Sequence, residues 1–185
     1  MQVWQESGPS WALGVIALGL LVVAIGAWRR RSLPTATSLA LLCLTLAIWT
    51  LADGLSAAAA LLGLKLFLTK IEWLCVLCVV PLWLQFANAF ARRPPLAWRR
   101  LALLWSLAAV LTPFVASNWQ GLLFGRVVLT TNPSGVVAVY HYGPLASAIG
   151  VTASLVVLLG IAWVLRASRS SSVSYRRQAL MLAGV

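Results

Sequence analysis

The chain has 185 residues, of which 62% are hydrophobic and 9% charged, and its mean hydropathy is +0.94. A water-soluble domain is usually about half apolar and about a quarter charged, so this composition excludes an ordinary soluble globule. The net charge of +11 would suit a nucleic-acid-binding protein, but the 14 basic residues form no single patch and lie mostly in short clusters between apolar stretches. The sequence therefore predicts an all-α integral membrane helical bundle that contacts the lipid bilayer and binds no nucleic acid.

Five apolar stretches are long enough to cross the bilayer. The first, residues 11–28, would extend roughly 27 Å as a helix, and it has a tryptophan at each end. The other spans are expected at about residues 35–60, 69–91, 99–117 and 144–165, and residues 178–185 look like the start of a sixth span. We therefore expect a single transmembrane domain over residues 1–185, with five complete spans and one partial span.

The basic residues indicate the orientation of this bundle. If the N-terminus is outside, eleven of the 14 arginines and lysines face the cytoplasm, and only Lys65, Lys70 and Arg126 face outward. Cytoplasmic loops of membrane proteins carry an excess of Lys and Arg, so this asymmetry predicts a multi-pass protein with its N-terminus outside.

The long connection at residues 118–143 is then on the outer side. Its β-branched and aromatic residues flank the turn signal Asn132-Pro133-Ser134-Gly135. This pattern favours a short outer β-hairpin over the mouth of the bundle, and an irregular loop is the alternative.

The few acidic residues define a candidate ligand site. Asp53 and Glu72 are expected near the outer ends of the second and third spans, where an ionised side chain normally faces protein or water. With Lys65 and Lys70 they would form either an interfacial charge network or a polar cup open to the outside. Arg126 and His141 of the hairpin would share this cup.

Helical spacing adds further candidates. Trp49 lies on the same face of the second span as Asp53, and Gln85 and Asn88 share a face of the third span. Such polar side chains also serve as hydrogen-bonding contacts between helices, and a deep tryptophan such as Trp83 can equally be a core residue. The complete set of candidate ligand-binding residues is Asp53, Glu72, Trp49, Trp83, Gln85, Asn88, Arg126 and His141.

No catalytic or metal-binding motif is recognisable in the sequence. Cys75 and Cys78 match C-x-x-C, but a zinc or redox site needs further ligands or a thioredoxin-like context. His141 has no acid or nucleophile at the spacing of a triad. We therefore expect no catalytic residues, no metal and no cofactor.

Four stretches carry a resemblance to a known family: KIEWLCVLCVVPLWLQFANAF, SNW, YHYGPL and SYRRQALMLAGV. From about Leu39 onward, the chain resembles the N-terminal seven-transmembrane sensory region of bacterial histidine kinases. The resemblance implies a sensor in the bacterial cytoplasmic (inner) membrane. It also implies a cytoplasmic transmitter domain in the full-length parent, where any kinase or cyclase activity would lie.

Two functions remain open at this level. The first is a sensory input module that passes an external or in-membrane signal to a cytoplasmic output domain. The second is a structural or auxiliary subunit of a larger membrane complex, in which the small residues at 57–60, Gly150 and Gly160 would form contacts between helices. In either case the expected partners are other membrane helices or a second copy of the chain.

Overall fold

The computed structural model describes residues 4, 8–33, 35–91, 98–132 and 135–169. Within this part of the chain, five helices are long and apolar enough to span a membrane. A two-stranded antiparallel sheet comes between the fourth and fifth of these helices in the sequence. In chain order the elements are α1 (Gly8–Arg29), α2 (Ala36–Ala58), α3 (Leu62–Phe90), α4 (Trp98–Ser117), the 3₁₀ turn η1 (Trp119–Gly121), β1 (Phe124–Asn132), β2 (Gly135–Tyr142) and α5 (Pro144–Arg169). The predicted helical bundle with a β-hairpin is confirmed, while the partial span expected at residues 178–185 lies outside the described residues.

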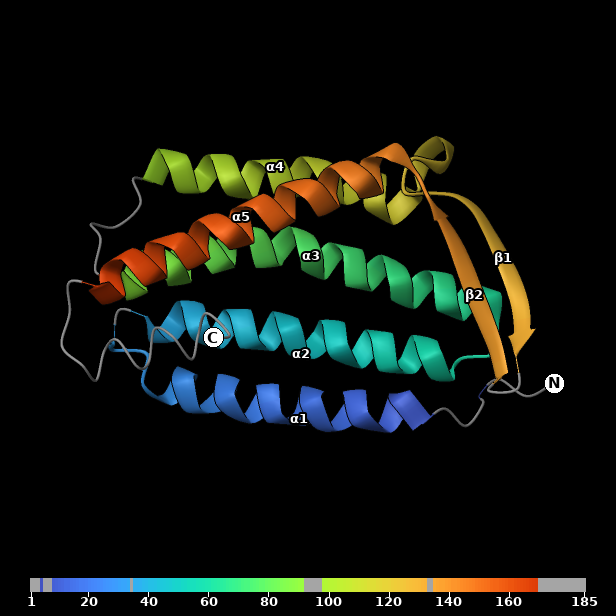
Figure 1. Cartoon of the computed structure of the whole chain (residues 1–185), viewed down its shortest axis with the longest axis horizontal. Coiled ribbons are helices and arrows are strands. Elements are labelled where there is room, and N and C mark those ends of the chain that lie inside the picture. The colour runs from blue at the N-terminus through green and yellow to red at the C-terminus, as the bar shows by residue number, and fades with distance from the viewer. Residues whose placement is uncertain (1–3, 5–7, 34, 92–97, 133–134, 170–185) are drawn as a thin grey trace.

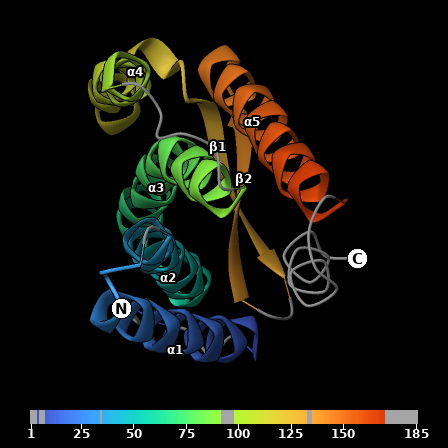
Figure 2. The ribbon, with the colours of Figure 1, turned by 90° about the vertical axis from the view of Figure 1, so that its left-hand side faces the viewer.

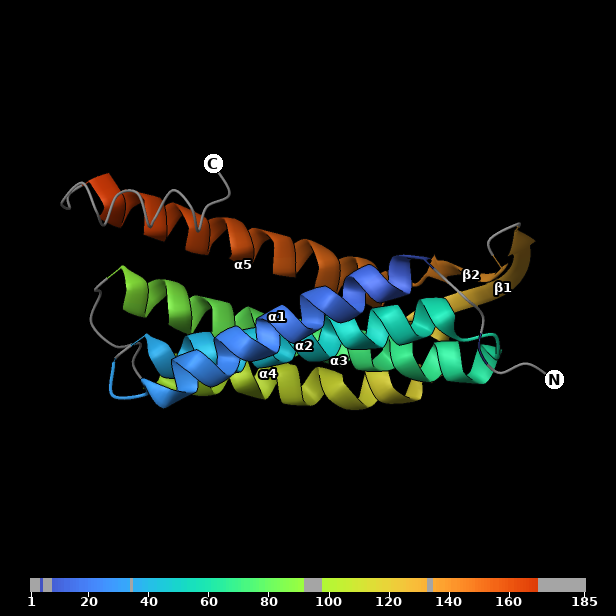
Figure 3. The same ribbon diagram turned by 90° about the horizontal axis from the view of Figure 1, so that it is seen from below.

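The helices run along one long axis, and α3 is the central helix (Figures 1 and 3). It packs against α2, α4 and α5, whereas α1 packs mainly against α2 (Figure 2). The hairpin crosses one end of the bundle, which we call the hairpin end (Figure 1).

The seam between α1 and α2 is built from small residues at heptad spacing. Ala17 and Ala24 of α1, and Ala40, Ala47 and Gly54 of α2, are all buried. A Cβ atom at Gly54 would lie 3.2 Å from the Leu13 Cβ, so the two helices approach closely there. Because lipid tails are as apolar as leucine, close contact between small residues is the usual way for membrane helices to associate.

The third helix starts earlier than the expected span, at Leu62 instead of residue 69. The added turns contain Lys65, whose side chain is buried and donates a hydrogen bond of 2.8 Å to the Ser56 carbonyl. That carbonyl lies in the last turn of α2, where helix carbonyls lack partners and carry partial negative charge. Lys65 therefore lies within α3 and not in a loop, because its side chain caps the C-terminal end of α2.

The hairpin is fixed to the end of α4 by Asn118, which has a left-handed backbone (φ 50°). Its side-chain oxygen accepts hydrogen bonds from the amides of Leu123 (3.0 Å) and Phe124 (2.9 Å). Its side-chain nitrogen donates to the Phe124 carbonyl at 3.1 Å. This one side chain satisfies three backbone groups of a buried turn, so it determines where β1 begins.

The hairpin continues directly into α5 at Gly143. A Cβ atom there would collide with the Leu122 carbonyl oxygen, so only glycine fits. The Gly143 amide donates to the Leu123 carbonyl at 2.9 Å. The start of α5 is thereby tied to the turn that Asn118 organises.

Further along the membrane, α3 and α5 are joined through Trp83. Its indole Nε1 donates a 3.2 Å hydrogen bond to the Val157 carbonyl. The ring lies over Gly160, where any side chain would collide with it. Gly160 is thus required for the close packing of these two helices.

Candidate functional site

The hairpin places two tyrosines against the hairpin end of α3. Its strands pair Val127 with Tyr140 and Arg126 with His141, so successive residues face opposite sides. The Tyr140 hydroxyl lies 3.0 Å from the Thr69 hydroxyl of α3, within hydrogen-bonding distance. His141, one residue further along, is exposed. The face with Tyr140 is therefore the one that packs on the bundle.

An aromatic cluster surrounds this contact. The Tyr142 ring meets the Trp73 ring of α3 edge-on, with centroids 5.8 Å apart and planes at 64°. The Tyr140 ring lies 5.2 Å from Phe124. Edge-to-face aromatic pairs add about 0.5–1.5 kcal/mol to burial of their surface, so the hairpin is held by its side chains as well as by its strand ends.

Glu72 lies within the same contact. Its Oε1 atom is buried and, among the described residues, has no hydrogen-bond partner. Tyr142 is 58% exposed, and its partial burial raises its pKa above the usual value; the negative charges of Glu72, Tyr140 and Asp53 raise it further. Both acids are thus close enough to the hairpin for their charges to act on its tyrosines.

Tyr140 shows the same environment. Burial raises the pKa of its hydroxyl, hydrogen bonding to Thr69 lowers it, the charge of Glu72 raises it and hydrogen bonding to Ser56 lowers it. We call Ser56, Thr69, Glu72, Tyr140 and Tyr142 the polar cluster. Asp53 is exposed at its edge.

Lys65 does not neutralise this cluster. Its ammonium group donates to the Ser56 carbonyl, as described above, and within the described part of the chain no ion pair joins it to either acid. The cluster therefore combines acidic and hydroxyl groups beneath an aromatic cover, an arrangement suited to a ligand that donates hydrogen bonds.

The structure brings together only some of the residues singled out in the sequence. Asp53 and Glu72 lie at the hairpin end, and Trp49 is half-buried one helical turn deeper on α2. Arg126 and His141 pair across the strands and are both exposed, on the hairpin face opposite Tyr140.

The remaining candidates lie far from the polar cluster. Gln85 and Asn88 are 13 and 16 residues after Glu72 on α3, which is roughly 20 and 24 Å along the helix axis. Trp83 is committed to its hydrogen bond with α5. Asn88 is buried and Gln85 half-buried at the other end of the bundle, and none of the three residues lines the polar cluster.

The site residues predicted from the sequence did not include Tyr140, Tyr142 and Thr69. The signal that could have found the tyrosines is their spacing of two in a predicted strand, which places both on one face while His141 points away. Nothing in the sequence pairs Thr69 with Tyr140, because the two residues are 71 positions apart.

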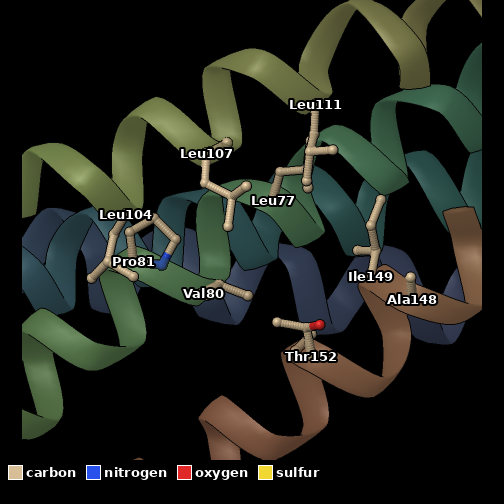
Figure 4. Close-up of a pocket in the computed structure, with 11 residues that line it drawn as sticks. Leu77, Val80, Pro81, Leu104, Leu107, Leu111, Ala148, Ile149 and Thr152 are labelled. Carbon is tan, nitrogen blue, oxygen red and sulfur yellow. The ribbon is translucent and has the colours of Figure 1, made fainter.

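A second candidate site is an apolar cavity deep in the membrane-spanning region (Figure 4). It has a volume of about 190 Å³ and lies where α3, α4 and α5 meet. Leu77 and Pro81 of α3, Leu107 and Leu111 of α4, and Ile149 of α5 are among its lining residues, and Thr152 supplies the only polar side chain. A cavity of this size and character accepts small apolar molecules.

The described residues contain no group of three or more His, Cys, Asp or Glu side chains that could hold a metal ion. Cys43, Cys75 and Cys78 are free thiols within α2 and α3.

Comparison with known proteins identifies the family. The family model for the N-terminal 7TM region of histidine kinase matches residues 12–185. The chain belongs to this family. The family is the sensory region of histidine kinases and not their catalytic domain, and in the full-length proteins it is linked to a cytoplasmic kinase domain. No curated protein and no solved structure matches the chain.

Proposed function

We propose that this chain is the sensory input module of a bacterial signal-transduction protein, and that its external signal acts at the polar cluster beneath the hairpin. We place it in the cytoplasmic membrane with its N-terminus outside, because eleven of 14 basic residues then face the cytoplasm. In this orientation the hairpin is extracytoplasmic. Any phosphoryl transfer would belong to a cytoplasmic output domain in the full-length parent, and the chain itself would be no enzyme.

The observation that carries the proposal is the unpartnered Glu72 oxygen beside the Tyr140–Thr69 contact. A buried carboxylate oxygen without a donor costs free energy, so a ligand that supplies a donor would be favoured. A signal changes a conformational equilibrium only if it binds the two states differently. A donor to Glu72 would do so, because the state with the hairpin packed and the state with it released expose this oxygen to different surroundings.

The connection to the cytoplasm runs through α5. Gly143 leaves no slack between β2 and α5, so a shift of the hairpin moves the start of this helix. Trp83 joins α5 to α3 further along the membrane. The two attachments make α5 the element that would transmit a displacement from the hairpin end to the opposite side.

The test uses substitutions of the cluster in the full-length protein. Thr69→Val and Glu72→Gln should abolish the response to the external signal while membrane expression stays normal. Thr130→Val is the matched control, because Thr130 is an exposed hairpin threonine whose hydroxyl donates to the Val137 carbonyl of the other strand. Output activity would be measured with and without signal, and an unchanged response in both cluster variants would refute the proposal.

Reporter fusions test the orientation independently. Fusions after Arg31 and at Ser171 should report the cytoplasm, and a fusion at Ser134 should report the outside. A cytoplasmic signal at Ser134 would reverse the proposed topology.

The apolar cavity favours a second version of the same function, in which the signal reaches the protein from within the membrane. A small apolar molecule between α4 and α5 would alter how both pack on α3. Ala153→Leu should then remove the response and leave Glu72→Gln responsive, the opposite of the result expected for the polar cluster. The remaining alternative, a structural or auxiliary subunit, predicts that none of these substitutions changes signalling and that the chain copurifies with other membrane subunits.

A further inference from the structure

The α1–α2 seam carries two grooves, and each has one arginine among its lining residues. One groove, of about 360 Å³, lies between Leu21, Ala24 and Ile25 of α1 and Ala40 and Leu44 of α2, and Arg29 closes its end. The other, of about 390 Å³, reaches Arg30. A Cβ atom at Gly26, which lines this second groove, would meet nothing within 4 Å. The second groove is therefore open at Gly26, and both grooves combine an apolar wall with one positive charge at the same end of the bundle.

The groove that ends at Arg29 has a floor of small residues and exposed apolar edges. Ala24 and Ala40 are buried in the seam, while the leucine and isoleucine side chains at its rim are between 39% and 48% exposed. Because α1 and α2 are long and apolar enough to span a membrane, these exposed apolar edges lie at the depth of the lipid chains. From Leu21 to Arg29 the groove runs roughly 12 Å along the helix, close to the depth of about 15 Å of one hydrocarbon leaflet.

The positive charge at this end has no acidic partner in the described part of the chain. Of the three acids in the sequence, the two that the structure describes are Asp53 and Glu72, and both lie at the hairpin end. The Arg31 guanidinium lies 5.9 Å from the centre of the Trp28 ring, a second interfacial anchor next to the groove. Because neither of these acids neutralises the arginines, the arginines are available to bind an anion at the membrane surface.

We propose that the α1–α2 seam binds an anionic phospholipid, with its phosphate at Arg29 and one acyl chain in the groove between the two helices. The chemistry is matched at both ends: guanidinium groups hold phosphate by paired, charge-assisted hydrogen bonds, and the groove wall is apolar to the depth that an acyl chain reaches. The bound lipid would fill the space beside α1, the helix that packs mainly on α2.

The experiment is native mass spectrometry of the purified chain from mixed micelles that contain phosphatidylglycerol and phosphatidylcholine with identical acyl chains. The chain should retain phosphatidylglycerol in preference to phosphatidylcholine. Arg29→Gln should reduce this preference about fivefold, the effect of one arginine at an anionic surface. The matched control is Arg166→Gln, because Arg166 is an exposed arginine of α5 that lines neither groove.

A second pair of variants tests the groove itself. Ala24→Leu fills the floor and should weaken lipid retention, whereas Ala17→Leu perturbs the same seam two turns away, outside both grooves, and should not. Equal retention of the two lipids by the wild-type chain would overturn the proposal. So would equal losses in Arg29→Gln and Arg166→Gln, or in Ala24→Leu and Ala17→Leu, since they would indicate general attraction or general disruption and no site.

Discussion

Asn118 offers a direct test of how the hairpin is held over the polar cluster. Replacing it by alanine removes three hydrogen bonds, of 2.9, 3.0 and 3.1 Å, from backbone groups of Leu123 and Phe124. At about 1 kcal/mol for each, the loss is about 3 kcal/mol, and the left-handed backbone adds about 1 kcal/mol when alanine must adopt it. Leu123 and Phe124 are almost completely buried, so water cannot easily replace the lost partners.

Two further substitutions separate the cost of the lost hydrogen bonds from the cost of the left-handed backbone. Asn118→Asp keeps an oxygen that accepts from both amides, but its second oxygen replaces the donor and faces the Phe124 carbonyl, so it should cost about 1–3 kcal/mol, less than Asn118→Ala. Asn118→Gly loses all three bonds but relieves the backbone strain, so it should be about 1 kcal/mol less damaging than Asn118→Ala.

The assay is amide hydrogen exchange of the hairpin in lipid nanodiscs. The combined loss of about 4 kcal/mol in Asn118→Ala should speed exchange in β1 and β2 roughly 700-fold, because each 1.4 kcal/mol is about tenfold. Exchange in the middle of α2, away from the hairpin, serves as the internal control. Equal exchange rates in the alanine and aspartate variants would refute the assignment of these hydrogen bonds as the anchor of the hairpin.

Three other perturbations have defined outcomes. Gly160→Ala should displace the Trp83 indole and cost about 1–3 kcal/mol in an unfolding titration, whereas Trp83→Phe should cost less because it loses the hydrogen bond without overpacking. Lys65→Met should destabilise the chain by about 1–2 kcal/mol, because it leaves the Ser56 carbonyl without its donor, and Lys65→Arg should restore most of that loss. Tyr140 should ionise only above pH 10, since burial raises its pKa. The stability that its protonated form contributes is complete below pH 10 and is lost as the pH rises through the folded-state pKa. Tyrosinate absorbance, compared between the wild type and Tyr140→Phe, would detect this ionisation.

The sequence alone determined the architecture of the membrane part. Spans of apolar residues near the bilayer thickness, separated by arginines and prolines, leave few alternatives to a helical bundle, since backbone groups inside lipid must be satisfied within each helix. The hairpin was also predictable, because the Asn132–Gly135 turn signal and the flanking β-branched residues are local features. The start of α3 was not, because Lys65 resembles a loop residue until the end of α2 that it caps is placed beside it.

The candidate site was determined only in part by the sequence. The scarcity of acids pointed to Asp53 and Glu72. The helical rise within the third span already places Gln85 and Asn88 roughly 20 Å or more along the axis from Glu72, so this separation follows from the sequence. For Arg126 and His141, alternation along a strand predicts only that side chains fall on two faces, and the packing of the hairpin decides which face is covered. The Tyr140–Thr69 contact joins residues 71 positions apart, and only the docking of the hairpin on α3 creates it. Local patterns thus set which elements form, while contacts between distant segments decide which of their side chains share a site, because those contacts depend on how the helices pack and not on the spacing within any one of them.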